Sequence, residues 1–230
     1  MAQESEATRP RDIVATLRPQ IYGKKSPADV KDPIVEPLWV GVRALAAIDE
    51  TGVILIDQAG VTVEGFDEIV ASLAEVAMAS GLVLDGFLTK QATQTAIAIH
   101  SWSDETPSMA TFVGLRRNRA VDAVKLREET LAARSFTIDD EISYVATDLL
   151  WVDDMSLLDI PLLERRRILE SVLDESDVVR IGAFIRPPIM SWVGSWKAQG
   201  FRGITYKAAN SRYHPGEAHS DWAISGMPHR

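Results

Sequence analysis

The stretch EPLWVGVRALAAI, at residues 36–48, decides the fold that we expect for this chain. Within it, the apolar residues 39–48 predict a strand, and residues 53–56 predict a second one. The intervening residues 49–52, DETG, form a short loop that contains a glycine, so the two strands predict a β-hairpin. A third apolar piece at residues 61–63 is expected to extend this meander.

Length and composition are those of a soluble globular protein. The 230 residues suffice for one well-filled domain or two small ones, and 46% of them are hydrophobic while 25% are charged. There is no apolar run of about 18 residues and no basic-then-apolar leader, so we expect neither a membrane span nor a secretory signal. The absence of cysteine excludes disulfides and thiolate metal sites, and it fits a cytoplasmic protein.

The charge balance argues against a general binder of the DNA backbone. The formal net charge is −9. Proteins that bind the DNA backbone usually carry a basic surplus, because the neutralisation of phosphates supplies most of their non-specific affinity. We therefore do not expect this chain to bind DNA on its own.

Helices and strands interleave along the rest of the chain without regular βαβ spacing, which favours an α+β fold. Residues 1–12 are expected to form a loose polar arm, and residues 23–33 carry turn residues that lead into the first strand. Asp159 is a plausible N-cap, with Pro161 near the first helical turn. Expected helices lie at residues 65–80 (ended by Gly81), 118–134, 162–173 and 192–199 (ended by Gly200), and expected strands at 82–88, 95–100, 142–152, 178–185 and 201–207.

Residues 36–44, EPLWVGVRA, resemble the nucleotide-attachment strand of ATP-dependent DNA ligases, which reads EPKWDGxRA. Leu38 stands at the place of the family's nucleophilic lysine, and Val40 stands at the place of an aspartate. In that family the lysine amine attacks the α-phosphate of ATP and forms a covalent lysyl-AMP. A leucine has no lone pair and no titratable proton, so covalent catalysis is not available at this position. We expect both Leu38 and Val40 to be buried and to contribute to packing.

Further segments resemble the same family in the order that the family has them. Residues 57–60, DQAG, keep only the glycine of a Ser-Arg-x-Gly turn that touches substrate, and residues 84–87, LDGF, end in Phe87 where the family has a glutamate of the nucleotide and metal site. Residues 144–166 give the longest match, with Thr147 at the place of the aromatic residue that stacks on adenine. In residues 201–207, FRGITYK, Arg202 replaces a metal-site glutamate.

The last motif of the family reads Trp-x-Lys-x-Lys, but residues 222–226 read WAISG, so both phosphate-binding lysines are missing. The resemblance covers residues 33–226 and implies an α+β, ligase-type (ATP-grasp-like) nucleotidyltransferase domain with antiparallel sheets flanked by helices. We expect residues 1–32 to be an N-terminal arm and lead-in, residues 33–230 to be the adenylation domain, and no OB domain to follow.

Four residues remain where the resemblance implies nucleotide binding: Glu36, Arg43, Asp85 and Lys207. The family uses the residue at position 36 to recognise the adenine amino group and the one at position 43 on the ribose side. The structural alternative is that Arg43 makes an ion pair, Asp85 caps a turn and Lys207 is a solvated strand end. We favour this alternative, and we assign no catalytic and no metal-binding residue.

Other chemistry-bearing side chains lack the arrangement that a site needs. Three lysines lie upstream of the altered strand, where a loop lysine rarely achieves the alignment with a phosphate that attack requires: Lys24, Lys25 and Lys31. The four histidines lack metal-ligand spacing. His214 and His219 lie near Glu217 in a Pro-Gly loop, and we expect loop or surface roles for them.

Two functions follow from these residues. The first is a degenerate ligase-like domain without catalytic activity that acts as a binding or scaffold protein, with an unknown protein partner and a link to DNA repair by descent. The second is an active ATP-dependent DNA ligase or nucleotidyltransferase that uses non-standard residues, with ATP and Mg²⁺ as its cofactors. We favour the first. Trp192 and Trp196 share a helical face, which fits packing on a sheet or anchoring of a partner.

Overall fold

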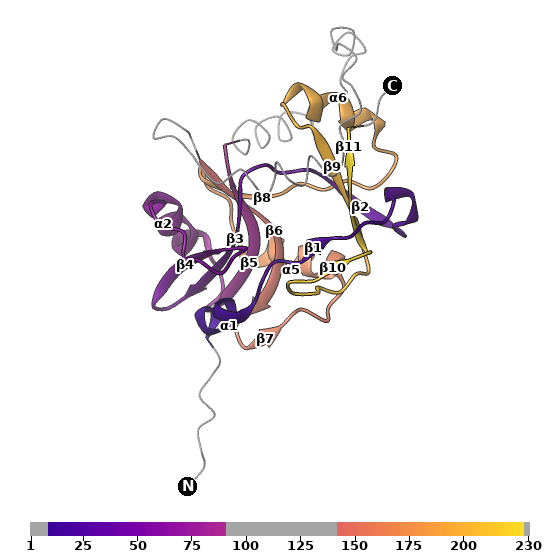
Figure 1. Ribbon diagram of the computed structural model, residues 1–230. Helices are drawn as coiled ribbons and strands as arrows, with labels where there is room; N and C mark the ends of the chain where they lie inside the picture. Colours follow the sequence, from indigo (N-terminus) through magenta and orange to yellow (C-terminus); the bar gives the residue numbers. More distant parts are fainter. Residues whose placement is uncertain (1–8, 91–141, 228–230) are drawn as a thin grey trace.

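Two sheets that pack against each other form the framework of the protein (Figure 1). The structure is a computed structural model that describes residues 9–90 and 142–227. The strand expected at residues 95–100 and the helix expected at residues 118–134 lie outside these ranges.

The larger sheet contains the expected hairpin, in which β3 (Val42–Asp49) pairs with β4 (Gly52–Asp57). The other edge of β3 pairs with β5 (Leu82–Thr89), and β5 in turn pairs with β6 (Ser143–Val152). All of these pairings are antiparallel. The hairpin is confirmed, although β3 begins at Val42 rather than at residue 39. The remaining strands of this sheet are β7 (Met155–Ser156) and β8 (Val179–Ile181), the second of them parallel to β6.

Two strand predictions were too long. Of the strand expected at residues 178–185, only β8 forms. The chain then leaves the larger sheet, and Ile185 bridges Val35 of the smaller one. The piece at residues 61–63 adds to the meander only through a single bridge between Thr62 and Ile56.

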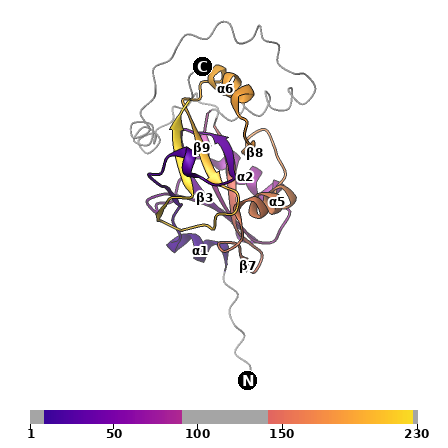
Figure 2. The same ribbon diagram turned by 90° about the vertical axis from the view of Figure 1, so that its right-hand side faces the viewer.

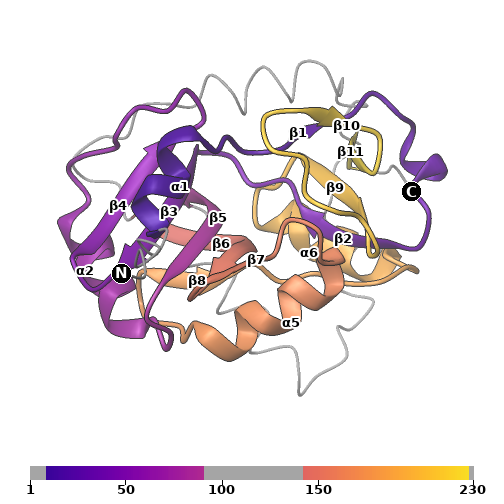
Figure 3. The ribbon, with the colours of Figure 1, turned by 90° about the horizontal axis from the view of Figure 1, so that it is seen from below.

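A smaller antiparallel sheet has the strand order β11–β9–β2, where β2 is Pro33–Pro37, β9 is Gly203–Ala208 and β11 is Trp222–Gly226. The sequence predicts neither β2 nor β11, and it places the start of β9 two residues too early. Prolines occupy both ends of β2, which is an edge strand, where a missing N–H is tolerated. A short parallel pair, β1 (Ile21–Tyr22) with β10 (Ala218–His219), lies near this sheet (Figure 3).

Helices pack on both sheets. Helix α2 (Asp67–Val76) contacts β4, α5 (Leu162–Val172) contacts β6, and α6 (Met190–Ala198) lies at one end of the smaller sheet (Figures 1 and 2). The N-terminal helix α1 (Pro10–Thr16) packs on β3, and a 3-10 turn, η1 (Pro27–Asp29), precedes β2. None of the helices in the described ranges is long and apolar enough to cross a membrane.

Three helix predictions need correction. The loose arm expected at residues 1–12 is wrong for residues 10–12, because α1 begins at Pro10 and buries Val14, and residues 1–8 lie outside the described ranges. Helix α2 stops at Val76, well before Gly81, since Ala77 already has an extended backbone and bridges Leu173. Asp159 does not cap α5: the N-cap residue is Pro161, without a side-chain cap, and Asp159 instead accepts a hydrogen bond from Arg212.

Alternate residues of the larger sheet face two different cores. On β3, Ala44 and Ala46 pack in the cluster with α2 and α5, whereas Leu45 and Ala47 pack in the cluster that includes β11. Because side chains along a strand alternate with a period of two, Arg43 lies on the same face as Leu45 and points toward the smaller sheet. This inner face, between the two sheets, holds the candidate site.

Candidate functional site

Leu38, at the position of the family's nucleophile, is part of the core between the sheets. It lies just after β2, its exposed fraction is 1%, and its backbone N–H donates to the carbonyl of Gly203 at 2.9 Å. It belongs to an apolar cluster with Leu45 of β3 and with Trp222 and Ile224 of β11. The expected burial of Leu38 is therefore confirmed.

Val40 is only half-buried, so the expectation that it is core holds in part. Its carbonyl accepts a hydrogen bond of 2.7 Å from the Thr89 hydroxyl. The residue that follows, Gly41, lies so close to the carbonyl of Leu88 that a Cβ atom would be 2.0 Å from that oxygen. The backbone of residues 40–41, just before β3, therefore lies against the end of β5.

Glu36 and Lys207 form a buried ion pair across the smaller sheet. Their side chains are diagonal neighbours on β2 and β9, since Glu36 is opposite Thr205, and the Nζ–Oε2 distance is 2.7 Å with each side chain 1% exposed. The Lys207 ammonium also lies 4.5 Å from the ring centroid of Trp222, the residue opposite it on β11. The expectation that Lys207 is a solvated strand end is wrong.

The Glu36 carboxylate keeps Lys207 charged. Burial lowers the pKa of the amine, but the charge and hydrogen bond of Glu36, together with the nearby Tyr22 and Asp148, outweigh burial, so the pKa of Lys207 lies above its usual value. A protonated ammonium has no lone pair, which means that this lysine is held as a cation and not as a nucleophile.

A second buried ion pair joins Arg43 of β3 to Asp85 of β5. The guanidinium donates from Nε and Nη2 to the two carboxylate oxygens at 2.9 and 2.5 Å, and from Nη1 to the carbonyl of Gln20 at 2.6 Å. The Tyr213 hydroxyl donates to Asp85 at 2.6 Å and accepts from the backbone N–H of Gln20 at 2.9 Å. The structural role proposed for Arg43 matches this pair, but Asp85 lies within β5 and caps no turn.

The electrostatics of this network favour its present protonation state. Burial lowers the pKa of Arg43, but the charge and hydrogen bonds of Asp85, together with Tyr213 and Tyr22, outweigh burial, so the pKa of Arg43 shifts upward. Burial also raises the pKa of the Tyr213 phenol well above its usual value, and the neighbouring Asp85 charge adds to the increase. Two cations and two anions thus balance within a region closed by aromatic rings.

The structure brings all four sequence-predicted residues to one region, around the ring of Trp222. The Arg43 guanidinium lies 5.8 Å from the Trp222 centroid, and Tyr22 and Tyr213 each lie 5.7 Å from it. The sequence did not indicate Tyr22, Tyr213 or Gln20 as members of this cluster. Their separations from their partners, such as 128 residues between Tyr213 and Asp85, leave no local signal.

The residues at the metal positions do not fit Mg²⁺. Phe87 is 2% exposed and packs in an apolar cluster with Trp39 and Trp196, and Arg202 is an exposed cation. Mg²⁺ requires oxygen ligands in an octahedral arrangement, which a phenyl ring and a guanidinium cannot supply. No step through Mg²⁺ can be derived from these side chains.

Two other altered motif residues have structural contacts. Thr147, at the place of the adenine-stacking residue, is 2% exposed and donates to the carbonyl of Asp85 at 3.2 Å. Asp57 lies in the turn with which other members of the family touch substrate. Here its carboxylate accepts hydrogen bonds from the backbone N–H groups of Ala59 and Val61 at 2.7 and 2.9 Å. Both contacts stabilise the chain's own backbone.

The best-matching segment also folds into a structural contact. Asp148 of β6 and Arg165 of α5 make a bidentate pair at 2.8 and 2.7 Å, with both side chains 0% exposed. Arg165 further donates to the carbonyl of Ile160 at 2.5 Å. This pair fixes α5 on the larger sheet.

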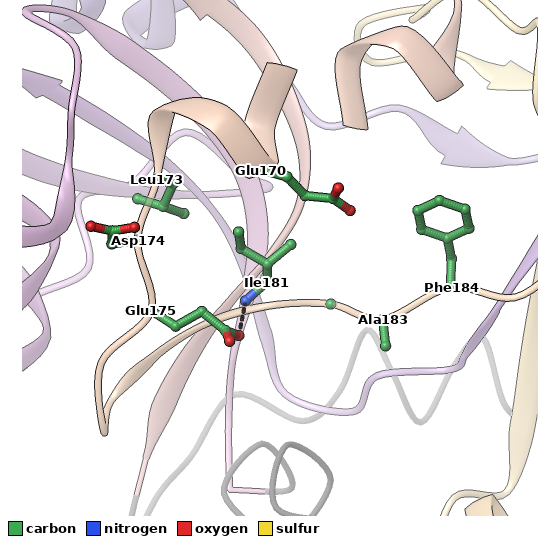
Figure 4. Close-up of a pocket in the computed structure, with 8 residues that line it drawn as sticks. Glu170, Leu173, Asp174, Glu175, Ile181, Ala183 and Phe184 are labelled. Carbon is green, nitrogen blue, oxygen red and sulfur yellow. Dashed lines mark hydrogen bonds between the residues drawn. The ribbon is translucent and has the colours of Figure 1, made fainter. Parts of the chain in front are cut away.

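A cavity of about 580 Å³ lies elsewhere, at the C-terminal end of α5 and beside β8 (Figure 4). Figure 4 shows the Glu170 carboxylate on its wall and the Glu175 carboxylate accepting a hydrogen bond of 2.9 Å from the N–H of Ile181. Neither Glu36, Arg43, Asp85 nor Lys207 lines it. Its acidic side chains, which include Asp174, would repel a triphosphate.

The remaining sequence candidates lie apart from the charged cluster. Lys24, Lys25 and Lys31 are exposed. Trp196 is 1% exposed and packs in the core, whereas Trp192 is half-buried with its ring centroid 6.5 Å away, so packing accounts for this pair. His100 and His229 lie outside the described residues.

The fold is that of a ligase-type nucleotidyltransferase domain. A family model described as an ATP dependent DNA ligase domain matches residues 25–223, and this chain therefore belongs to that family. The match begins eight residues before the start of the domain expected at residue 33, and it includes Glu36, Arg43, Asp85 and Lys207 as well as Trp222.

Individual relatives are distant and longer. A DNA ligase from Methanothrix thermoacetophila is 36% identical over 84 residues, which is 33% of this chain and 14% of that protein. The ligase domain of LigD from M. tuberculosis superposes with a TM-score of 0.58 at 20% identity, over 90% of this chain and 58% of that one. A mycobacterial DNA ligase D complexed with ATP and MES gives 0.58 at 19% identity, over 90% and 59%. The chain spans less than two thirds of each.

Proposed function

We propose that this chain is a non-catalytic member of the ATP-dependent DNA ligase domain family that acts as a binding or scaffold protein. The observation that carries the proposal is Leu38, which occupies the position of the nucleophile and is packed, at 1% exposure, in an apolar cluster. Covalent catalysis needs a nucleophile with an available lone pair at this point. A hydrocarbon side chain in a dry core supplies none.

The charged residues around Leu38 support the proposal. Each cation of the cluster already has an anionic partner, Lys207 with Glu36 and Arg43 with Asp85. A triphosphate would have to displace these carboxylates, and breaking a buried ion pair costs about 3–5 kcal/mol. The network therefore stabilises the fold in the place where an active relative would hold ATP.

An active enzyme that uses non-standard residues is the alternative. One observation favours retained nucleotide binding: within the described part of the chain, Glu36 Oε1 is buried and accepts no hydrogen bond. This oxygen is an acceptor for the amino group of a base. A replacement nucleophile is harder to find, since Lys207 is held as a cation by Glu36.

Nick sealing tests the proposal against this alternative. The protein is incubated with end-labelled nicked duplex, ATP and Mg²⁺, beside a DNA ligase of established activity. We expect no sealed product above the no-protein background. Sealing that requires ATP and disappears in Lys207→Met would contradict the proposal and assign activity to the remaining residues.

Equilibrium dialysis with labelled ATP separates the binding question from catalysis. We expect no saturable binding, because the charged side chains at the family's nucleotide-binding positions are already paired with each other. Saturable binding that Glu36→Gln abolishes, without nick sealing, would replace a scaffold role with reversible nucleotide binding.

The partner that we infer is a protein, and we place the chain in the cytoplasm with a link to DNA repair by descent. The net charge of −9 supports a protein partner over DNA, and the absence of cysteine fits a reducing compartment. Cross-linking in cells followed by identification of the adducts tests whether the partner is a protein and whether it belongs to DNA repair. Adducts dominated by DNA, rather than by one protein, would contradict the inference of a protein partner.

A further inference from the structure

Two histidines that the charged cluster does not use lie face to face near the end of the chain. The rings of His214, in the loop after β9, and His219, on β10, have centroids 3.8 Å apart and are inclined by 16°. Asp221 lies in the turn that joins β10 to β11, directly before Trp222. All three residues are half-buried, and one ligand atom from each lies within 4.8 Å of the others.

The loop that carries these side chains is held by its own backbone. Gly216 has a φ of 69°, which turns the chain between the two histidines, and the N–H of Glu217 donates to the carbonyl of His214 at 3.2 Å. The N–H of Asp221 donates to Nδ1 of His219 at 3.3 Å. The rings are therefore brought together by a defined turn.

The carboxylate that completes the group is Asp221 and not Glu217, the acid suggested by proximity in sequence. Oδ2 of Asp221 lies 3.4 Å from Nδ1 of His219. Glu217 is exposed and lies outside the group of convergent ligand atoms. A sequence spacing of His-x4-His-x-Asp matches no common motif, so only the turn reveals it.

We propose that His214, His219 and Asp221 form a binding site for a divalent transition-metal ion of the Zn²⁺ class. Each histidine would contribute one ring nitrogen and Asp221 one carboxylate oxygen, with water as the fourth ligand. Three protein ligands with an open fourth position are a common arrangement for Zn²⁺, at ligand distances of about 2.0–2.2 Å. Zn²⁺, Cu²⁺ and Ni²⁺ favour imidazole, whereas Mg²⁺ and Ca²⁺ favour sites built from oxygen.

Metal binding would require the two histidine rings to turn out of their stack and the ligand atoms to move closer together. Two ligands of a tetrahedral ion at about 2.1 Å are roughly 3.4 Å from each other. The three ligand atoms already lie within 4.8 Å of one another. An imidazole binds a metal ion through a lone pair in its ring plane, so the stacked rings of His214 and His219 must turn until both planes contain the ion. The hydrogen bond at Nδ1 of His219 is at the long end of the usual range, so exchanging it for a metal bond sacrifices little.

The site also lies on a contact between the two ends of the chain. The N–H of Gly216 donates to the carbonyl of Arg18, and the N–H of Ile21 donates to the carbonyl of Glu217, both at 2.9 Å. The N–H of His214 donates to Oε1 of Gln20 at 2.8 Å. A metal ion that fixes the loop would therefore also stabilise the pairing of β1 with β10.

Calorimetric titration with Zn²⁺ of the untagged protein is the first test. We expect one site in the wild type, and a loss of affinity of at least about tenfold in His214→Gln, His219→Gln and Asp221→Asn, the smallest effect expected when a metal site loses a partner. Glu217→Gln is the matched control, because it removes a carboxylate of the same loop, and should bind as the wild type does. Equal affinity in all four variants would overturn the proposal.

Two readouts on the wild type remain decisive if a variant folds poorly. Zn²⁺ at about a hundred times its Kd should raise Tm by roughly 5–10 °C and should slow amide exchange at Ile21 and Gly216. Co²⁺ in place of Zn²⁺ should give the intense visible absorption of a four-coordinate ion. An unchanged Tm together with a six-coordinate Co²⁺ spectrum would contradict the assigned site.

Discussion

Arg43 on β3 holds Asp85 on the neighbouring strand β5 through two hydrogen bonds, of 2.9 and 2.5 Å, in a core where Asp85 is fully buried. Arg43 lies opposite Phe87 and Asp85 opposite Leu45, so the two residues are diagonal neighbours across the strands. Glu36 and Lys207 are related in the same way on β2 and β9. Two strand registers thus place the four residues at the family's nucleotide-binding positions in two internal ion pairs.

Removing one member of the Arg43–Asp85 pair should be costly. We expect Asp85→Leu and Arg43→Leu each to destabilise the protein by about 3–5 kcal/mol, because the remaining charge is left buried without its partner. Replacing both residues by leucine should restore much of that loss, so the single effects should not add. Urea denaturation of the wild type, both single variants and the double variant measures the coupling.

An exposed ion pair provides the control for that cycle. Arg212 and Asp159 lie 3.2 Å apart with side chains 67% and 86% exposed. Asp159→Ala should cost less than about 1 kcal/mol. Purely additive effects of the Arg43 and Asp85 variants would show that the buried pair does not act as a unit.

Restoring a lysine at position 38 should destabilise the fold without restoring catalysis. Leu38→Lys places a polar or charged amine among apolar side chains, which we expect to cost about 2–4 kcal/mol in the free energy of unfolding. Leu38→Met, which preserves volume and polarity, should cost less than about 1.5 kcal/mol. Thermal denaturation compares the two variants. An unchanged Tm for Leu38→Lys would contradict the packing described for this position.

The tyrosines should titrate only at strongly alkaline pH in the folded protein. Burial raises the pKa of Tyr144 and Tyr213 well above the usual value, and it also raises the pKa of Tyr22 and Tyr206. A group whose pKa is higher in the folded state stabilises the fold below its unfolded pKa, which is about 10 for a phenol. That contribution is lost as the pH rises through the folded pKa, so stability should fall above about pH 10.

Phenolate absorbance measured alongside circular dichroism checks the alkaline prediction. In denaturant the phenols should ionise near pH 10. In the folded protein their ionisation should begin at higher pH and accompany the loss of structure. Ionisation of all four tyrosines near pH 10 with intact circular dichroism would show that the phenols are not buried as described.

Binding to nicked duplex DNA should be negligible at about 0.15 M ionic strength, where charges are screened beyond roughly 8 Å. The net charge is −9, and the turn at Asp57 presents a carboxylate where the family has a serine and an arginine. Fluorescence anisotropy with labelled nicked DNA measures the affinity, and a DNA ligase of established activity serves as control. Saturable micromolar binding that falls steeply with salt would return DNA to the list of partners.

The β3–β4 hairpin and the family of the fold could be predicted from the sequence, because local sequence patterns indicate both. The β3–β4 hairpin follows from two apolar runs around a glycine-containing loop, and the order of the ligase-like segments gave the family. Strand β2 gave no such signal, since it is short and begins and ends with proline. Helix α1 has only seven residues and directly follows a polar segment.

The candidate site could be predicted only in part. Glu36, Arg43, Asp85 and Lys207 were found because each occupies a motif position. Their pairing depends on the register between strands that are distant in the sequence, and no local pattern indicates that register. For this reason the sequence alone suggests a solvent-exposed Lys207 and an Asp85 at a turn. The histidine pair depends in the same way on a turn at Gly216.

Intact-mass spectrometry after incubation with ATP and Mg²⁺ tests directly whether the chain forms a covalent bond to AMP. We expect an unchanged mass, because Leu38 replaces the attacking amine and Lys207 is held as a cation by Glu36. A DNA ligase of established activity, treated in parallel, should gain the mass of one AMP. An AMP adduct on this chain that peptide mapping assigns to a lysine would contradict the account.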